Sequence, residues 1–181
     1  MEPEASREEV RRAAQAYGAT NPGLIPLSDK RYRKLHHGDG QPAVVISTKP
    51  LRVAAYSVDL DAVALLRFPF RLVKEFDLEV GDRLLSTNSY KNDEEPDGDL
   101  RLGPDYMGVW NGFWPMIADF VTEDLDALEE CKARISKPLW KRAETLGQAW
   151  FQERPHFVRN GDPLYSDVPA EEAPLKDFQL D

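Results

Sequence analysis

A group of cations around one aromatic ring is the first feature of this chain that could bind a ligand. Lys30, Arg31, Arg33 and Lys34 surround Tyr32 within five consecutive residues. Such interleaving can hold phosphates while the ring stacks on a base. The four cations are therefore candidate ligand-binding residues. The alternative is a solvated basic loop that pairs with the protein's own acidic surface.

The histidines could do acid–base or metal chemistry. His36 and His37 are adjacent, and neighbouring side chains diverge in a helix or a strand, so they do not predict a metal site. Near the end of the chain, His156 could act as a general base and Arg159 could hold an anion, which makes both candidate ligand-binding residues. The turn-forming sequence over 160–163 explains these polar residues equally well, and no catalytic residue is assigned.

Aromatic and acidic side chains in the middle of the chain are candidate contacts with a protein partner. The pair Asn111-Gly112 predicts a two-residue hairpin turn, which would place Trp110 opposite Phe113. Exposed Trp and Tyr side chains commonly anchor protein interfaces, and burial beneath helices is the alternative. The candidate contact residues are aromatic or acidic: Tyr106, Trp110, Phe113, Trp114, Asp93, Glu94 and Glu95.

Other chemistry-bearing residues match no known catalytic or cofactor motif. The chain has no phosphate-binding glycine loop, no zinc-protease or EF-hand pattern and no paired cysteines, so the sequence predicts no cofactor and favours a non-enzymatic role. The single cysteine, Cys131, falls on the apolar side of a predicted helix and is expected to be buried. Asp59 and Asp61 would form a carboxylate pair if a strand ran through them, and a tight turn explains them equally well.

Length, composition and charge limit the possible functions. A chain of 181 residues with 41% hydrophobic residues fits one globular domain. A net charge of −9 argues against general nucleic-acid binding and is compatible with a basic protein partner. With one cysteine, a charged stretch over 1–12 and no apolar run of about 20 residues, we expect a cytoplasmic protein that does not enter membranes.

The elements that must position these residues follow from periodicity and from Gly and Pro punctuation. Helices are predicted at 6–17, over the short stretch 69–76, from a Thr122 cap to Ile135, and from Ser136 to Pro155. Strands are predicted at 43–48, 52–58, 62–68 and 83–90, and Asn160-Gly161 predicts a second hairpin turn.

Strands followed by late helices, without regular alternation, predict an α+β fold. We expect a mostly antiparallel sheet over 1–166 in a single domain, with an N-terminal helix and the late helical pair packed on it, and an acidic irregular tail over 167–181. The expected function is that of an adaptor, inhibitor or immunity-type domain that binds a basic partner. The alternative is a small enzyme or ligand-binding domain acting on an anionic small molecule.

Overall fold

A computed structural model describes residues 40–91, 97–106, 112–120 and 124–161. Several predicted features lie outside these ranges, so their predictions stand as they were made. They are the N-terminal helix 6–17, the basic residues Lys30, Arg31, Arg33 and Lys34, the histidine pair His36 and His37, the acidic Asp93, Glu94 and Glu95, Trp110, and the tail 167–181.

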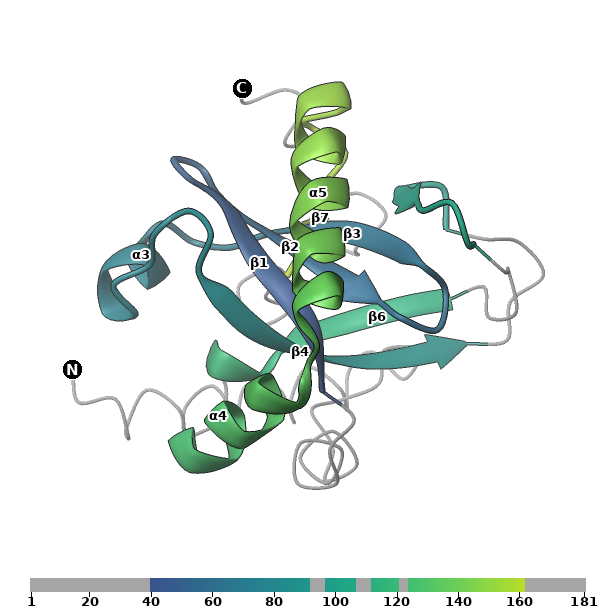
Figure 1. Cartoon of the computed structure of the whole chain (residues 1–181). Helices are drawn as coiled ribbons and strands as arrows, with labels where there is room; N and C mark the ends of the chain where they lie inside the picture. Colours follow the sequence, from purple (N-terminus) through teal and green to yellow (C-terminus); the bar gives the residue numbers. More distant parts are fainter. Residues whose placement is uncertain (1–39, 92–96, 107–111, 121–123, 162–181) are drawn as a thin grey trace.

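The described chain is an α+β fold around a curled sheet (Figure 1). The strands are β1 (Gly40–Thr48), β2 (Leu51–Ser57), β3 (Ala62–Arg67), β4 (Arg83–Lys91), β5 (Leu100–Leu102), β6 (Gly112–Ile117) and β7 (Arg159–Asn160). The helices are α3 (Arg71–Glu75), the 3-10 turn η1 (Ala118–Phe120), α4 (Leu125–Arg134) and α5 (Lys137–Glu153). The order is β5-β3-β2-β1-β4-β6 with antiparallel neighbours, and β7 pairs with β3 in parallel.

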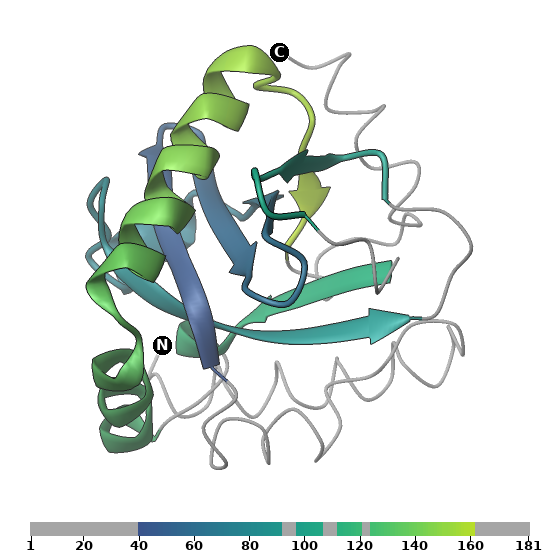
Figure 2. The ribbon, with the colours of Figure 1, turned by 45° about the vertical axis from the view of Figure 1, so that its right-hand side comes forward.

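Both faces of the sheet are buried at β1 to β3. Successive residues of a strand point to opposite faces, and in these strands residues of both sets are buried and mostly apolar. Ala43 and Val45 join one apolar cluster, and Val44 and Ile46 join the cluster beneath α5. Figure 2 shows α5 lying across this second face. Gly147 allows the close approach, since a Cβ there would lie 2.4 Å from the Cβ of Ala54.

The late helical pair packs on the sheet as predicted. Trp140 and Trp150 anchor α5 on the β1–β3 face, and Leu128 of α4 packs with Cys131 against Leu85 of β4. The predicted burial of Cys131 is confirmed. The cap of α4 is Asp124, which accepts a hydrogen bond from the Ala127 amide at 3.0 Å, instead of the predicted Thr122. Neither α3, α4 nor α5 is long and apolar enough to cross a membrane.

The predicted hairpin turn at Asn160-Gly161 is wrong. Asn160 lies in β7 and pairs with Arg67, and the amide of Gly161 donates to the Arg67 carbonyl at 2.9 Å. The two-residue hairpin turns need positive φ at one or both central positions, and neither residue has it. The open edge of β3 provides an alternative set of partners, which overrides the local turn preference of the pair.

The outer edge of β6 is closed by side chains and by a proline. The Phe113 amide donates to Asp97 at 2.9 Å, and the Phe113 carbonyl accepts a hydrogen bond from Arg159. Backbone N–H and C=O groups alternate in direction along an antiparallel strand, so the backbone of Pro115, two residues after Phe113, also points away from β4. Proline has no N–H, so no donor is present at this position. Proline is largely confined to edge strands, and β6 lies at the end of the described sheet.

Candidate functional site

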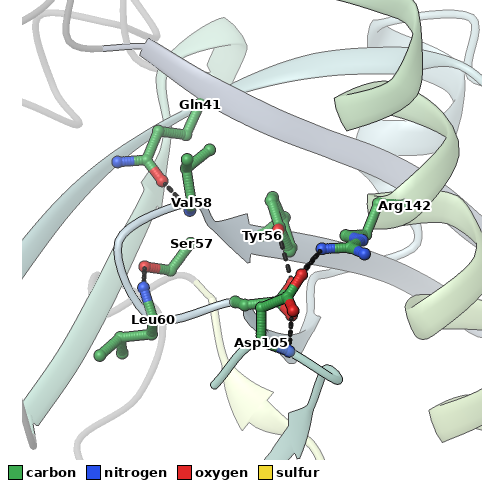
Figure 3. Close-up of polar contacts among 8 residues, drawn as sticks. Gln41, Tyr56, Ser57, Val58, Leu60, Asp105 and Arg142 are labelled. Carbon is green, nitrogen blue, oxygen red and sulfur yellow. Dashed lines mark hydrogen bonds and ion pairs between the residues drawn. The ribbon is translucent and has the colours of Figure 1, made fainter. Parts of the chain in front are cut away.

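The turn between β2 and β3 is surrounded by a dense polar network, drawn in Figure 3. Asp61 is at its centre, 4% exposed and in the left-handed region with φ of 52°. Its carboxylate accepts from the Tyr56 hydroxyl at 2.6 Å, from the Asp105 amide at 2.8 Å and from Arg142 at 3.2 Å. Gly103 permits the approach of the following loop, because a Cβ there would lie 2.4 Å from the Asp61 carboxylate.

A second set of hydrogen bonds holds the other side of the same turn. Gln41 of β1 accepts from the Val58 amide at 2.7 Å, and the Ser57 hydroxyl accepts from the Leu60 amide at 3.1 Å (Figure 3). Ser57 also lies 2.7 Å from the Tyr90 hydroxyl, which donates to Asp59 at 2.9 Å. The turn is thus bonded to β1 through Gln41 and to β4 through Tyr90.

Neither side of the turn is arranged for catalysis. Burial first, and then the neighbouring Asp61 carboxylate, raise the pKa of Tyr56 to about 12, so its phenol stays protonated at neutral pH. Ser57 is fully buried and out of reach of a substrate. The suggested pairing of Asp59 with Asp61 is wrong, because the strand does not continue through them and each carboxylate binds a different tyrosine. The network therefore stabilises the turn.

Arg159 forms a second polar centre, between the two ends of the curled sheet. Its side chain is 12% exposed and bonds to Asp99 at 2.6 Å and to Asp97 at 2.9 Å. The guanidinium also donates to the Phe113 carbonyl, and it lies 5.9 Å from the Phe113 ring and 5.8 Å from the Trp114 ring. Arg159 thus joins β7, the segment before β5 and β6 through internal partners.

A third polar centre lies beneath α4. The Asp119 carboxylate accepts from Lys132 and from the Leu85 amide, both at 2.6 Å. Burial raises the pKa of Asp119, and the adjacent Lys132 opposes part of that rise. This pair fastens η1 and α4 to β4.

The candidate contact residues that the structure describes differ in how far they are buried. Phe113 is fully buried and stacks on Tyr90 with ring centroids 5.9 Å apart, so its side chain does not reach the surface. Tyr106 and Trp114 are partly exposed, with Tyr106 packed beside the cluster that contains Phe113. His156 lies in the turn after α5, partly buried. Among the candidate residues that the structure describes, Phe113 and Trp114 both lie next to the Arg159 guanidinium.

One exposed surface was missed by sequence reasoning. On α4, Leu125 is 61% exposed, which is the largest value among the large apolar side chains of the described residues. Asp126, Glu129 and Glu130 of the same helix are also exposed. The helix-dipole pattern of acidic residues at the start of α4 accounts for some of these charges, but not for an exposed leucine among them. We call Leu125, Asp126, Glu129 and Glu130 the α4 acidic face.

Within the described ranges, no three His, Cys, Asp or Glu side chains are grouped so that they could hold a metal ion. Comparisons of the chain with protein-family models, with curated proteins and with solved structures found no match.

Proposed function

We propose that this chain is a protein-binding domain, of the adaptor, inhibitor or immunity type, that engages a basic partner through the α4 acidic face. The observation that carries the proposal is Leu125, an exposed apolar side chain on a helix that also exposes three carboxylates. Exposed apolar surface with polar residues at its rim marks many protein-binding sites. A partner that presents an apolar contact among lysines and arginines would complement it.

The charges of the α4 acidic face are only weakly neutralised within the domain. Glu129 lies 3.6 Å from Lys132, which already binds Asp119 at 2.6 Å. Glu130 lies 3.9 Å from Arg134, and both of these side chains are mainly exposed. Exposed pairs of this kind contribute little energy, so they would yield readily to a cation from a partner. The net charge of −9 would also steer a basic partner toward the domain.

The ligand-binding alternative receives less support. Arg159, the candidate anion-holding residue, is bonded to two carboxylates of its own chain, which would compete with a bound anion. We therefore do not propose a small-molecule substrate as a second function.

The test compares two variants with the same net charge. Asp126→Lys/Glu129→Lys reverses the α4 acidic face, and Glu75→Lys/Glu79→Lys reverses two exposed carboxylates near α3. Each changes the net charge by +4, from −9 to −5. Proteins captured from a cell extract by the wild-type chain are purified, and their direct affinities are measured at about 50 and about 300 mM salt, since added salt screens surface charge.

The proposal predicts a basic protein that binds the wild type and the α3 variant and loses affinity for the α4 variant. Leu125→Ala should also weaken binding, without the salt dependence. Equal loss in the two charge variants would mean that only the overall charge matters, which contradicts a site on α4. Unchanged affinity in the α4 variant and in Leu125→Ala would contradict the proposal outright.

A further inference from the structure

Lys132 of α4 is shared by two carboxylates in different surroundings. Its Nζ lies 2.6 Å from Asp119 Oδ1 and 3.6 Å from Glu129 Oε1. The Asp119 side chain is 11% exposed, whereas the Glu129 side chain is 77% exposed and belongs to the α4 acidic face. One cation therefore joins a carboxylate beneath the helix to a carboxylate on its surface, and the shorter contact holds it at the buried one.

The surroundings of Asp119 favour uptake of a proton. Beside it, Ala118 packs with Leu85 in an apolar cluster. To the carboxylate, α4 presents Lys132 and, through Lys132, Glu129, while β4 presents the neutral Leu85 amide. Burial raises the pKa of Asp119 above its ordinary 3.8, and the charge of Lys132 opposes part of the rise. Asp119 is therefore protonated earlier on acidification than an ordinary aspartate.

Protonation would displace Lys132. The Leu85 amide occupies Asp119 Oδ2, so the added proton belongs on Oδ1, the atom that now accepts from Lys132. An ammonium group has three donors and no acceptor, so it cannot bond to an O–H that points at it. Glu129 lies one turn earlier on the same helix, within reach of side-chain rotation alone.

We propose that protonation of Asp119 transfers Lys132 to Glu129, which neutralises part of the α4 acidic face and weakens its attraction for a basic partner. The effect on a partner rests on the function proposed above. By linkage, a basic partner that binds Glu129 would favour the ionised form of Asp119 and so release its proton.

The transfer does not require the domain to unfold. The raised pKa means that the folded chain holds the Asp119 proton more tightly than the unfolded chain does. The cost of burying this charge is thus relieved as the pH falls through the folded pKa toward 3.8, so this group does not destabilise the fold on acidification.

Nuclear magnetic resonance of the full-length chain tests the transfer without a partner. The Asp119 carboxyl carbon and the Lys132 ε-carbon are followed from about pH 7 to about pH 4, and both signals should move with one midpoint. In Glu129→Gln the Lys132 signal should reach a different acid end point, because the second acceptor has lost its charge. The matched control is Glu130→Gln, an exposed carboxylate that pairs with Arg134, and it should leave that end point unchanged.

Binding of a hexalysine peptide at about 50 mM salt tests the effect on the surface. In Asp119→Asn the amide can keep its oxygen on Leu85 and turn its NH2 group toward Lys132, which imitates the protonated carboxyl. We expect about threefold weaker binding than in the wild type at neutral pH. Glu75→Gln makes the same change of net charge at an exposed site on α3 and should weaken binding much less.

A Lys132 signal that does not follow Asp119, or an end point that is the same in Glu129→Gln and the wild type, would overturn the transfer. Equal losses of hexalysine affinity in Asp119→Asn and Glu75→Gln would overturn its effect on the surface. If Asp119→Asn does not fold, Glu129→Gln is used instead and should lose less affinity on acidification than the wild type. Wild-type affinity in Asp126→Lys/Glu129→Lys would contradict the proposed function, while the resonance titration alone still decides the transfer.

Discussion

Two arginines in this domain each bind a pair of aspartates, and their surroundings differ. Arg159 is 12% exposed and bridges Asp97 and Asp99 between the two ends of the curled sheet. Arg142 is 36% exposed and bridges Asp61 and Asp105 at the β2–β3 turn. The chemical groups are the same, yet water competes for Arg142 and is largely excluded from Arg159. Burial and the strands that each arginine joins, more than the number of charges, should decide what each contributes.

The largest effect is expected from Arg159→Met. The substitution leaves Asp97 and Asp99 without their cation and the Phe113 carbonyl without its donor, which should reduce the free energy of unfolding by roughly 3 kcal/mol. Urea unfolding at neutral pH measures the loss. The matched control is Arg101→Met, which removes an exposed pair with Glu153 and should cost about 1 kcal/mol or less. Equal losses would mean that burial does not distinguish the two sites.

Asp61→Asn should have the next largest effect. Both carboxylate oxygens of Asp61 accept hydrogen bonds, and an amide would turn an NH2 group toward one of these donors. We expect a loss of roughly 2 kcal/mol in the free energy of unfolding. Asp105→Asn is the control, because the Asp105 side chain is exposed and its backbone N–H still donates a hydrogen bond to the Asp61 carboxylate. If Asp105→Asn were the more damaging change, Asp61 would not be the centre of the network.

Tyr56→Phe should change the alkaline dependence of stability. The pKa of Tyr56 rises from 10.0 to about 12 in the folded chain, so the unfolded chain releases its proton first as the pH increases. The contribution of this tyrosine is therefore complete below about pH 10 and is lost as the pH rises to about 12. Over that interval the stability of the variant should fall less steeply than that of the wild type, by up to about 1.4 kcal/mol per pH unit.

Absorbance titration of the tyrosines provides the control for this result. Burial raises the pKa of Tyr90 to about 12 as well, so the wild type should contain at least two late-titrating tyrosines and Tyr56→Phe one fewer. An unchanged number of late-titrating tyrosines in the variant would contradict the assignment.

Arg142→Met should have the smallest effect of the series. Asp61 keeps its bonds to the Tyr56 hydroxyl and the Asp105 amide, and the exposed Asp105 carboxylate is solvated by water. The urea midpoint should move less than in Arg159→Met and in Asp61→Asn. A loss as large as that of Arg159→Met would remove the contrast between them.

The main elements of the fold could be predicted because their patterns are local. The strands β2 to β4 were predicted within one residue at each end, and β1 begins three residues before its predicted start, since runs such as Ala43–Thr48 are rich in β-branched residues and end at proline or at a turn. The helices α4 and α5 follow from their apolar periodicity. The strands β5 and β7 are three and two residues long, too short for any periodicity, and they exist because β3 offers its edge.

The polar centres could not be predicted in the same way. Arg142 and Asp61 are 81 positions apart, and Arg159 and Asp99 are 60 apart, so only the folded topology brings them together. Arg159 was selected as a candidate because of its neighbours in the sequence, and its carboxylate partners carry no local signal. For the α4 acidic face a signal existed, because Leu125 follows Asp124 and precedes Asp126, but its exposure depends on how α4 is rotated against β4.

The edge of β6 has a consequence for association between chains. A strand approaching from outside would find the amide and carbonyl of Phe113 already bonded to Asp97 and Arg159, and at Pro115 it would find no amide at all. Edges that offer free donors and acceptors in register act as templates for aggregation and domain swapping. Blocking two consecutive outward positions removes that template, so Arg159→Met should both loosen the sheet and make the protein more prone to aggregate through this edge.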